Sequence, residues 1–191
     1  MELQKINVKF FVAEPNDLPL AGFIDLFHGW IQASDGMYHD VADYSHMQAG
    51  PGIVLVANDA NLSIDETGYR RGLLYSRKSQ LKGSNESKLR EVVRSALENC
   101  RRIEEEPLLG RKLRFLGNEL VISINDRLLA PNTDACFQEI KPEIESLAKR
   151  LYTDAEVTLE RDSDPRKLFN VHIKTPRALD LKELLSNLHD N

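Results

Sequence analysis

Apolar side chains recur with two different periods along the chain, and these periods predict strands and amphipathic helices. Residues 6–12 form an apolar strand pattern, and residues 53–58 lack alternation, as expected of a strand buried on both faces. Apolar residues three and four positions apart predict helices over 20–31 and 86–105. The shorter apolar runs of this half predict three further strands, near 40–44, 62–64 and 73–75.

The second half of the chain continues the same alternation of elements. Alternating apolar residues on either side of Gly117-Asn118 predict a hairpin with a two-residue loop. A helix is expected over 134–151, and Pro142 should kink it or divide it into two pieces. A second hairpin then leads into a last helix, in which Asp180 and Glu183 have the spacing of a capping box.

The predicted order of elements favours an α+β protein with an antiparallel or mixed sheet and helices packed on one face. Each half matches the split βαβ layout of ferredoxin-like domains, although the second half lacks its final strand. In both halves a strand leads through a Pro-Asn turn, Pro15-Asn16 or Pro131-Asn132, into an amphipathic helix. Two ferredoxin-like halves, 1–117 and 118–191, are the preferred prediction. A single extended sheet in one compact domain is the alternative.

The composition is that of an ordinary globular protein. The 191 residues are 41% hydrophobic and 29% charged, which allows one full-sized domain or two small ones that share a core. The net charge of −5 disfavours a broad nucleic-acid surface, because an acidic surface repels the phosphate backbone. No window approaches the roughly 18–20 apolar residues of a membrane span, and no secretory signal begins the chain.

These features predict a cytoplasmic protein that binds neither nucleic acid nor membranes. Cys100 and Cys136 lie far apart and fall in helical patterns, so they are interpreted as buried free thiols in a reducing compartment. Ferredoxin-like sheets often pair edge to edge, which leaves a homodimer open. The sequence identifies neither a cofactor nor a ligand.

The densest polar cluster of the chain holds two imidazoles, two carboxylates and a phenol. Its candidate catalytic residues are His39, Asp40, Asp43, Tyr44 and His46. Such groups can support acid–base catalysis or bind a metal. In a helix His39, Asp43 and His46 would share one face, whereas the favoured strand places neighbouring side chains on alternate faces.

A metal would then need a ligand from elsewhere in the chain, and His28 is the obvious candidate. Ordinary structural roles are nevertheless favoured over metal binding for His28, His39, Asp43 and His46. Carboxylates near strand ends commonly accept hydrogen bonds from backbone amides, and a histidine beside the apolar face of a helix is usually a core residue.

Three arginines form a second candidate site, for a ligand with a carboxylate or a phosphate. Arg127, Arg161 and Arg166 could clamp such a group if the fold brings them together. Turn formation and surface ion pairs are the favoured interpretation of the polar segments that contain them. Covalent catalysis has no support, because no serine lies in a nucleophile elbow and neither cysteine has a base nearby.

Five segments carry a resemblance to known sequences, and together they extend over nearly the whole chain. They are 27–32, 40–46, 50–53, 72–78 and 124–133. These segments resemble a family of uncharacterised bacterial proteins of about this length. The resemblance implies a bacterial cytosolic protein, and it carries over no functional residue, activity, ligand or partner.

Three functions are compatible with the residues. A non-catalytic small-molecule-binding or regulatory module is favoured, because the polar residues suit turns and no catalytic signature is present. The first alternative is a metal-assisted or acid–base enzyme centred on the cluster from His39 to His46. The second is a structural or protein-interaction role, marked by an exposed apolar strand edge or patch.

Overall fold

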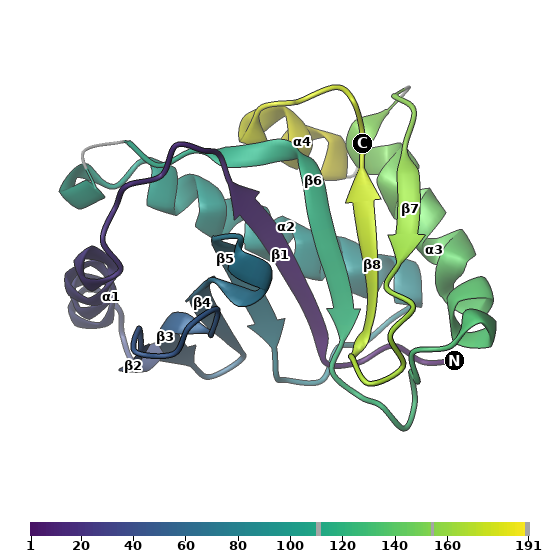
Figure 1. The fold of residues 1–191 in the computed structure, drawn as a ribbon, viewed down its shortest axis with the longest axis horizontal. Helices are drawn as coiled ribbons and strands as arrows, with labels where there is room; N and C mark the ends of the chain where they lie inside the picture. The colour runs from purple at the N-terminus through teal and green to yellow at the C-terminus, as the bar shows by residue number, and fades with distance from the viewer. Residues whose placement is uncertain (110–111, 154, 190–191) are drawn as a thin grey trace.

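One antiparallel sheet runs through the protein and carries helices on one face (Figure 1). The computed structural model describes residues 1–109, 112–153 and 155–189, which contain eight strands and four α-helices. The strands are β1 (Ile6–Val12), β2 (Tyr38–Tyr44), β3 (Gly52–Ala57), β4 (Ala60–Asp65), β5 (Gly72–Arg77), β6 (Phe115–Ile124), β7 (Thr158–Arg161) and β8 (Phe169–Lys174). The helices are α1 (Ala21–Ala33), α2 (Asn85–Glu104), α3 (Asp134–Tyr152) and α4 (Leu181–Leu188), with short 3₁₀ turns η1 (Thr67–Tyr69) and η2 (Pro107–Leu109). The predicted α+β class is confirmed.

Strand β1 lies inside the sheet, although it comes first in the chain. The strand order is β2-β3-β4-β5-β1-β6-β8-β7, and neighbouring strands are antiparallel. Figure 1 shows β1 between β5 and β6. The sheet is therefore continuous across both halves of the chain, as in the single-sheet alternative, and the ferredoxin-like halves are not confirmed. The predicted boundary between 117 and 118 falls inside β6.

The hairpin predicted at Gly117-Asn118 is wrong, because both residues lie within the continuous strand β6. Gly117 allows close packing instead of a turn. A β-carbon at this position would lie 1.7 Å from the carbonyl oxygen of Leu179, where the segment before α4 passes β6. A glycine that permits such an approach looks the same in the sequence as a turn glycine.

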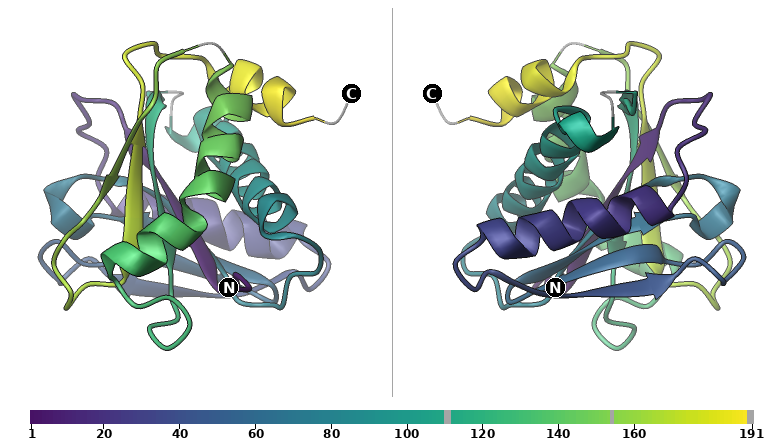
Figure 2. Two further views of the ribbon diagram at one scale, coloured as in Figure 1. Left: turned by 90° about the vertical axis from the view of Figure 1, so that its right-hand side faces the viewer. Right: turned by 90° about the vertical axis from the view of Figure 1, so that its left-hand side faces the viewer.

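All four helices cover the same face of the sheet, as the two side views show (Figure 2). Helix α2 packs on β1 and β5 and also contacts α3 and α4. Ser84 caps its first turn by accepting a hydrogen bond from the Ser87 amide at 3.2 Å. The cap predicted for α4 is confirmed, because Asp180 accepts from the Glu183 amide at 2.7 Å. Helix α3 continues through Pro142, so the chain is not divided there.

The core is one cluster of buried apolar side chains between the sheet and the helices. Cys100 and Cys136 are both buried and free, as predicted. Burial raises the pKa of the Cys100 thiol well above its ordinary value, which keeps this group protonated and unreactive. Within the described ranges, no helix combines the length and the apolar character that crossing a membrane requires.

Candidate functional site

A hollow of about 530 Å³ opens between the end of α1 and the second half of α2. Its lining comes from four parts of the chain: the segment after α1 up to the first residue of β2, the hairpin of β3 and β4, the second half of β5, and α2. Pockets for small molecules commonly have volumes of about 300–1,000 Å³. The hollow therefore has the size of a small-molecule site.

The floor of the hollow is apolar and buried. It is formed by Ala57, Ala60, Leu62 and Tyr75, none of which is more than 7% exposed. Ala57 and Ala60 end β3 and begin β4, so two small side chains stand where larger apolar residues would fill the space. These two small side chains leave space at the floor of the hollow.

One side of the hollow is held in place by Asn58, which lies in the turn between β3 and β4. Its side-chain amide donates to the carbonyl oxygen of Gly36 at 3.3 Å, and its Oδ1 lies 2.5 Å from Nε2 of His39. Its backbone amide donates to the carbonyl oxygen of Met37 at 3.2 Å. These contacts attach the turn to the segment that follows α1.

Aromatic and cationic side chains also hold the segment that follows α1. The guanidinium of Arg102, on α2, lies over the ring of Trp30 at 3.6 Å and donates to the hydroxyl of Tyr38 at 3.1 Å. The indole N–H of Trp30 donates to Glu106 at 2.6 Å. Helices α1 and α2 and the start of β2 are therefore linked around the hollow, and the lining residue Tyr38 is fixed in position.

Three carboxylates stand at the rim, on Asp35, Asp59 and Glu98, and all three residues are exposed. Throughout the described ranges, none of these carboxylates takes part in a hydrogen bond or an ion pair. Among the described lining residues Arg77 is the single cation, and its charge is directed to Glu91 on α2, at 3.5 Å. The ammonium group of Lys78 lies at the same edge, where it donates to the carbonyl oxygen of Ala57. The hollow thus has an apolar floor and a polar rim that includes three carboxylates without partners in the described ranges.

The candidate cluster from His39 to His46 does not converge. Residues 38–44 form the edge strand β2, so the favoured strand is confirmed. Asp40 pairs with Val56 and Asp43 with Ile53, an odd offset that places the two carboxylates on opposite faces of the sheet.

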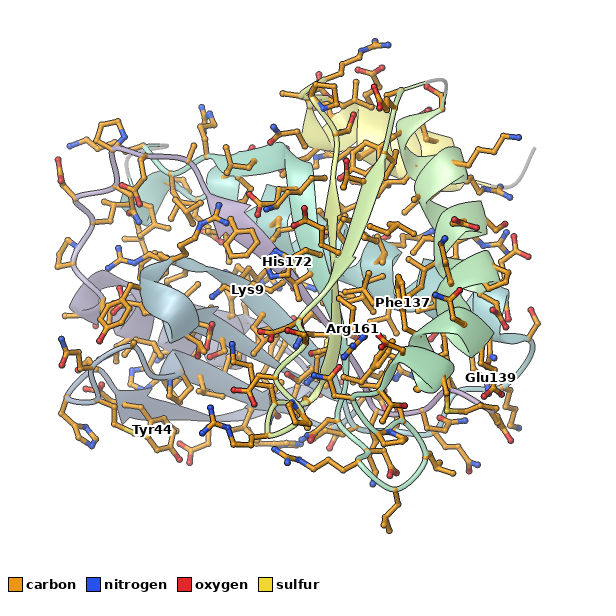
Figure 3. All side chains as sticks on the ribbon, turned by 45° about the vertical axis from the view of Figure 1, so that its right-hand side comes forward. Lys9, Tyr44, Phe137, Glu139, Arg161 and His172 are labelled. Atoms are coloured by element: carbon orange, nitrogen blue, oxygen red, sulfur yellow. The ribbon has the colours of Figure 1, made fainter. Side chains whose placement is uncertain are left out.

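The members of this cluster make local contacts. Asp40 accepts from the Val41 amide and Asp43 from the Ser45 amide, each at 2.8 Å. Hydrogen bonds from Ser45, first from its side chain, lower the pKa of Asp43. The rings of Tyr44 and His46 lie 6.5 Å apart, and Tyr44 ends the edge strand, far from the middle of the sheet (Figure 3).

The structure places His39 beside the hollow through Asn58, and it places His28 on an exposed position of α1. No set of three or more His, Cys, Asp or Glu side chains in the described part of the chain could hold a metal ion. The candidates His28, His39, Asp43 and His46 are therefore not gathered around one point.

The arginine candidates already have partners within the protein, with one exception. Arg161 donates to Asp134 at 2.6 Å, beside α3 (Figure 3), and to Oδ1 of Asn132 at 2.9 Å. Arg166 forms two hydrogen bonds with Asp164, at 2.8 and 3.0 Å, and they raise its pKa. Arg127 is exposed, without an ion pair in the described ranges. The three side chains do not form a common clamp.

A second charged cluster, on the face of the sheet without helices, was not predicted from the sequence. Lys9 on β1 donates to Asp65 at 2.5 Å and to the carbonyl oxygens of Thr67 and Arg70, at 3.1 and 2.7 Å. All three ammonium protons therefore have acceptors. Burial lowers the pKa of Lys9, and Asp65 opposes this effect. The sequence signal is a single lysine inside an apolar strand.

Arg70 and Glu119 extend this cluster across the sheet. The guanidinium of Arg70 donates to both oxygens of Glu119, at 2.7 and 2.8 Å, and lies 3.9 Å from the centre of the Phe11 ring. Nδ1 of His172 lies 3.7 Å from Glu119. Lys9 and His172, both labelled in Figure 3, pair with Val121 of β6 from its two sides. Burial, then the charge of Lys174, lowers the pKa of His172. This cluster holds the loop from 66 to 71 against the sheet.

A smaller hollow, of about 330 Å³, lies among the loops on the other side of the same segment. Its cation, Arg71, donates to Glu66 at 2.7 and 2.9 Å, to Asn16 at 3.1 Å and to the carbonyl oxygen of Leu18 at 2.5 Å. The guanidinium is largely occupied by these contacts. The hollow between α1 and α2 is therefore the stronger ligand site, because its floor is apolar and its rim carboxylates have no partner in the described ranges.

The chain matches no family model, and neither the curated proteins nor the solved structures provide a match.

Proposed function

We propose that the protein is a non-catalytic small-molecule-binding module, and that its ligand occupies the hollow between α1 and α2. The observation that carries the proposal is the combination of a buried apolar floor with rim carboxylates that have no partner in the described ranges. Sites of this kind bind the apolar body of a ligand by excluding water and orient it through a few polar groups.

The fixed walls of the hollow support this proposal. The contacts of Asn58 and Arg102 hold the lining segments in place without a ligand. A preformed site loses little conformational freedom when the ligand arrives, so more of the interaction energy appears as affinity.

The test is a fragment and metabolite screen by ligand-observed NMR, repeated on variants that fill the hollow. Ala60→Leu adds three carbon atoms to the floor, and Ser95→Phe fills the space from the α2 wall. Ala178→Leu is the matched control, because it is the same alanine-to-leucine substitution at an exposed position outside the hollow.

Compounds that bind the wild type are expected to lose binding in both filling variants and to keep it in the control. The folded state of each variant is checked by amide NMR spectra, because overpacking costs about 1–3 kcal/mol. The proposal fails if no compound binds the wild type. It also fails if the compounds bind both filling variants as tightly as the wild type while these variants are folded.

One observation favours a second candidate function, a protein-interaction role. Leu128 and Leu129 follow β6, and their exposed fractions are 95% and 52%. Adjacent exposed leucines favour contact with another apolar surface. Light scattering over a range of concentrations tests self-association: a mass above the monomer that Leu128→Ser/Leu129→Ser abolishes would support this role, and a strict monomer would argue against a homodimer.

A further inference from the structure

The face of the sheet opposite the helices carries a row of polar side chains that crosses five neighbouring strands. Strand pairing places each member of this polar row opposite the next. In their order across the sheet they are Asn61 of β4, Ser76 of β5, Asn7 of β1, Ser123 of β6 and Asn170 of β8. Val8 and Ile122, the next residues along β1 and β6, are buried in the core, so the row lies on the other face.

Four of these five side chains have no hydrogen-bond partner in the described part of the chain. The fifth, Asn170, donates to the carbonyl oxygen of Leu168 at 2.9 Å. Asn7, at the centre of the row, is only 8% exposed, and Oδ1 of Asn61 is buried without a partner. Buried amides are nearly always hydrogen-bonded, because a polar group that loses water without compensation costs free energy. Two amides of the row therefore lack the partners that their burial calls for.

The polar row differs from other buried polar side chains on the same face. Lys9 donates to Asp65, and the hydroxyl of Ser63 donates to the carbonyl oxygen of Pro51. Those groups stabilise the fold, whereas Asn7 and Asn61 bind nothing within the described ranges. Asparagine is also disfavoured inside strands, where β-branched residues are more stable. The amides of the row therefore cost stability without holding the fold together.

We infer that the polar row binds a neutral oligosaccharide, at a site separate from the hollow. Amide and hydroxyl side chains both donate and accept hydrogen bonds, as sugar hydroxyls do. The row itself contains no charged residue, so it offers a charged ligand no counter-ion. Half-buried Leu74 and Val121 lie beside the row, on either side of Lys9, where they can contact the C–H groups of sugar rings.

The shape of the row favours a chain of sugars over other polar ligands. Strands lie about 4.8 Å apart, so five strands carry hydrogen-bonding groups along about 19 Å. This length suits several linked rings better than a single sugar. An extended peptide is disfavoured, because its backbone groups pair with the edge of a sheet and not with its face.

The expected affinity is modest. Each hydrogen bond contributes little in water, because ligand and protein both lose hydration when it forms. Four or five such contacts correspond to a dissociation constant of about 1 mM. A single sugar reaches one or two of the side chains and should bind about tenfold more weakly or worse.

The test begins with an array of neutral and acidic glycans, maltopentaose and cellopentaose among the neutral ones. Each neutral oligosaccharide that binds is then titrated into the full chain and followed by NMR, with glucose for comparison. We expect the side-chain amide signals of Asn7 and Asn61 to shift. Ala57 and Ala60, at the floor of the hollow, should not respond.

The row is tested with the double variant Asn61→Ala/Ser76→Ala, which should weaken oligosaccharide binding about tenfold. Its matched control is Ser95→Ala/Asn99→Ala, which removes one hydroxyl and one amide from α2, beside the hollow. The control should bind like the wild type. Thermal denaturation should show no loss of stability in the row variant, because neither side chain has a partner in the described ranges.

The outcomes separate this inference from the proposed function. The inference is wrong if no neutral oligosaccharide binds, if only acidic glycans bind, or if the folded row variant keeps the wild-type affinity. If an oligosaccharide shifts Ala57 and Ala60 and the α2 control loses binding, the sugar occupies the hollow. That result would overturn the inference and support the proposed function.

Discussion

The open face of the sheet and the rim of the hollow use charged side chains in opposite ways. On the open face, the ammonium group of Lys9 has three acceptors, and the guanidinium of Arg70 has both oxygens of Glu119. At the rim, the carboxylates of Asp59 and Glu98 have no partner in the described ranges. The first set holds a loop to the sheet, whereas the second remains available to a ligand.

The difference has a physical cause in burial. The side chains of Lys9 and Asp65 are 9% and 4% exposed, and a charge removed from water is tolerated when it is paired and hydrogen-bonded. The rim carboxylates are exposed and stay hydrated, so they need no internal partner. Removing one buried partner should therefore affect folding, and removing rim charges should affect binding alone.

The largest effect is expected for Asp65→Ala, which leaves Lys9 buried without its counter-ion. Breaking one partner of a buried pair costs about 3–5 kcal/mol. Urea denaturation of wild type and variant measures this difference in the free energy of unfolding. The double variant Lys9→Met/Asp65→Leu should recover most of the loss; a loss below about 1 kcal/mol in Asp65→Ala would show that the pair does not anchor the loop.

Glu119→Gln should have a smaller effect, about 1 kcal/mol, because the Arg70 side chain is 44% exposed and water screens the pair. The hydrogen bonds from Arg70 lower the pKa of Glu119, so the unfolded chain takes up the proton first as the pH falls. The stabilisation is present above the ordinary carboxyl pKa of about 4.3 and is lost as the pH falls through the lowered value. The free energies of unfolding of wild type and Glu119→Gln, measured by denaturation at several pH values, should therefore converge as the pH is lowered from neutral to acidic.

His172→Gln should produce a still smaller effect, visible only in the pH dependence. The pKa of His172 is lowered in the folded protein, chiefly by burial, so the unfolded state binds its proton at higher pH. Wild-type stability should therefore decrease as the pH falls below about 6.5. In the variant, stability should depend less on pH in this range. Thermal denaturation at several pH values tests this, and a pH dependence equal to that of the wild type would contradict the prediction.

The smallest effect on stability is expected at the rim. Asp59→Asn/Glu98→Gln should change the free energy of unfolding by less than about 0.5 kcal/mol, as for surface substitutions without partners. Urea denaturation under the conditions used for Asp65→Ala gives a direct comparison. A loss of more than about 1 kcal/mol would mean that these carboxylates support the fold, and the contrast between the two regions would disappear.

The fold class and most elements were predictable because their signals are local. The apolar stripe of α2 and the cap of α4 lie within single segments, where spacing alone reports structure. The pairing of β1 with β5 and β6 joins residues far apart in the chain, so periodicity could not choose between one sheet and two halves. Gly117 was misinterpreted for the same reason, since its close neighbour is Leu179.

The candidate site was harder to predict, because the positions of charged and reactive residues in a sequence do not reveal where the folded protein leaves a cavity. Ala57 and Ala60 look like ordinary strand residues, and the walls of the hollow come from segments of different elements, which Asn58 and Arg102 link. Lys9 was a readable signal: a lysine within an apolar strand needs a partner, and here the partner is Asp65, on β4.

The position of β1 has a consequence for how the two parts of the chain hold together. Strands β2 to β5 and β6 to β8 lie on opposite sides of β1, which contributes hydrogen bonds to both groups. Strand pairing and shared core contacts therefore hold the two parts together, in addition to the peptide link between α2 and β6. A chain cut in that link would yield two pieces with complementary edges, suited to reassembly as a split protein.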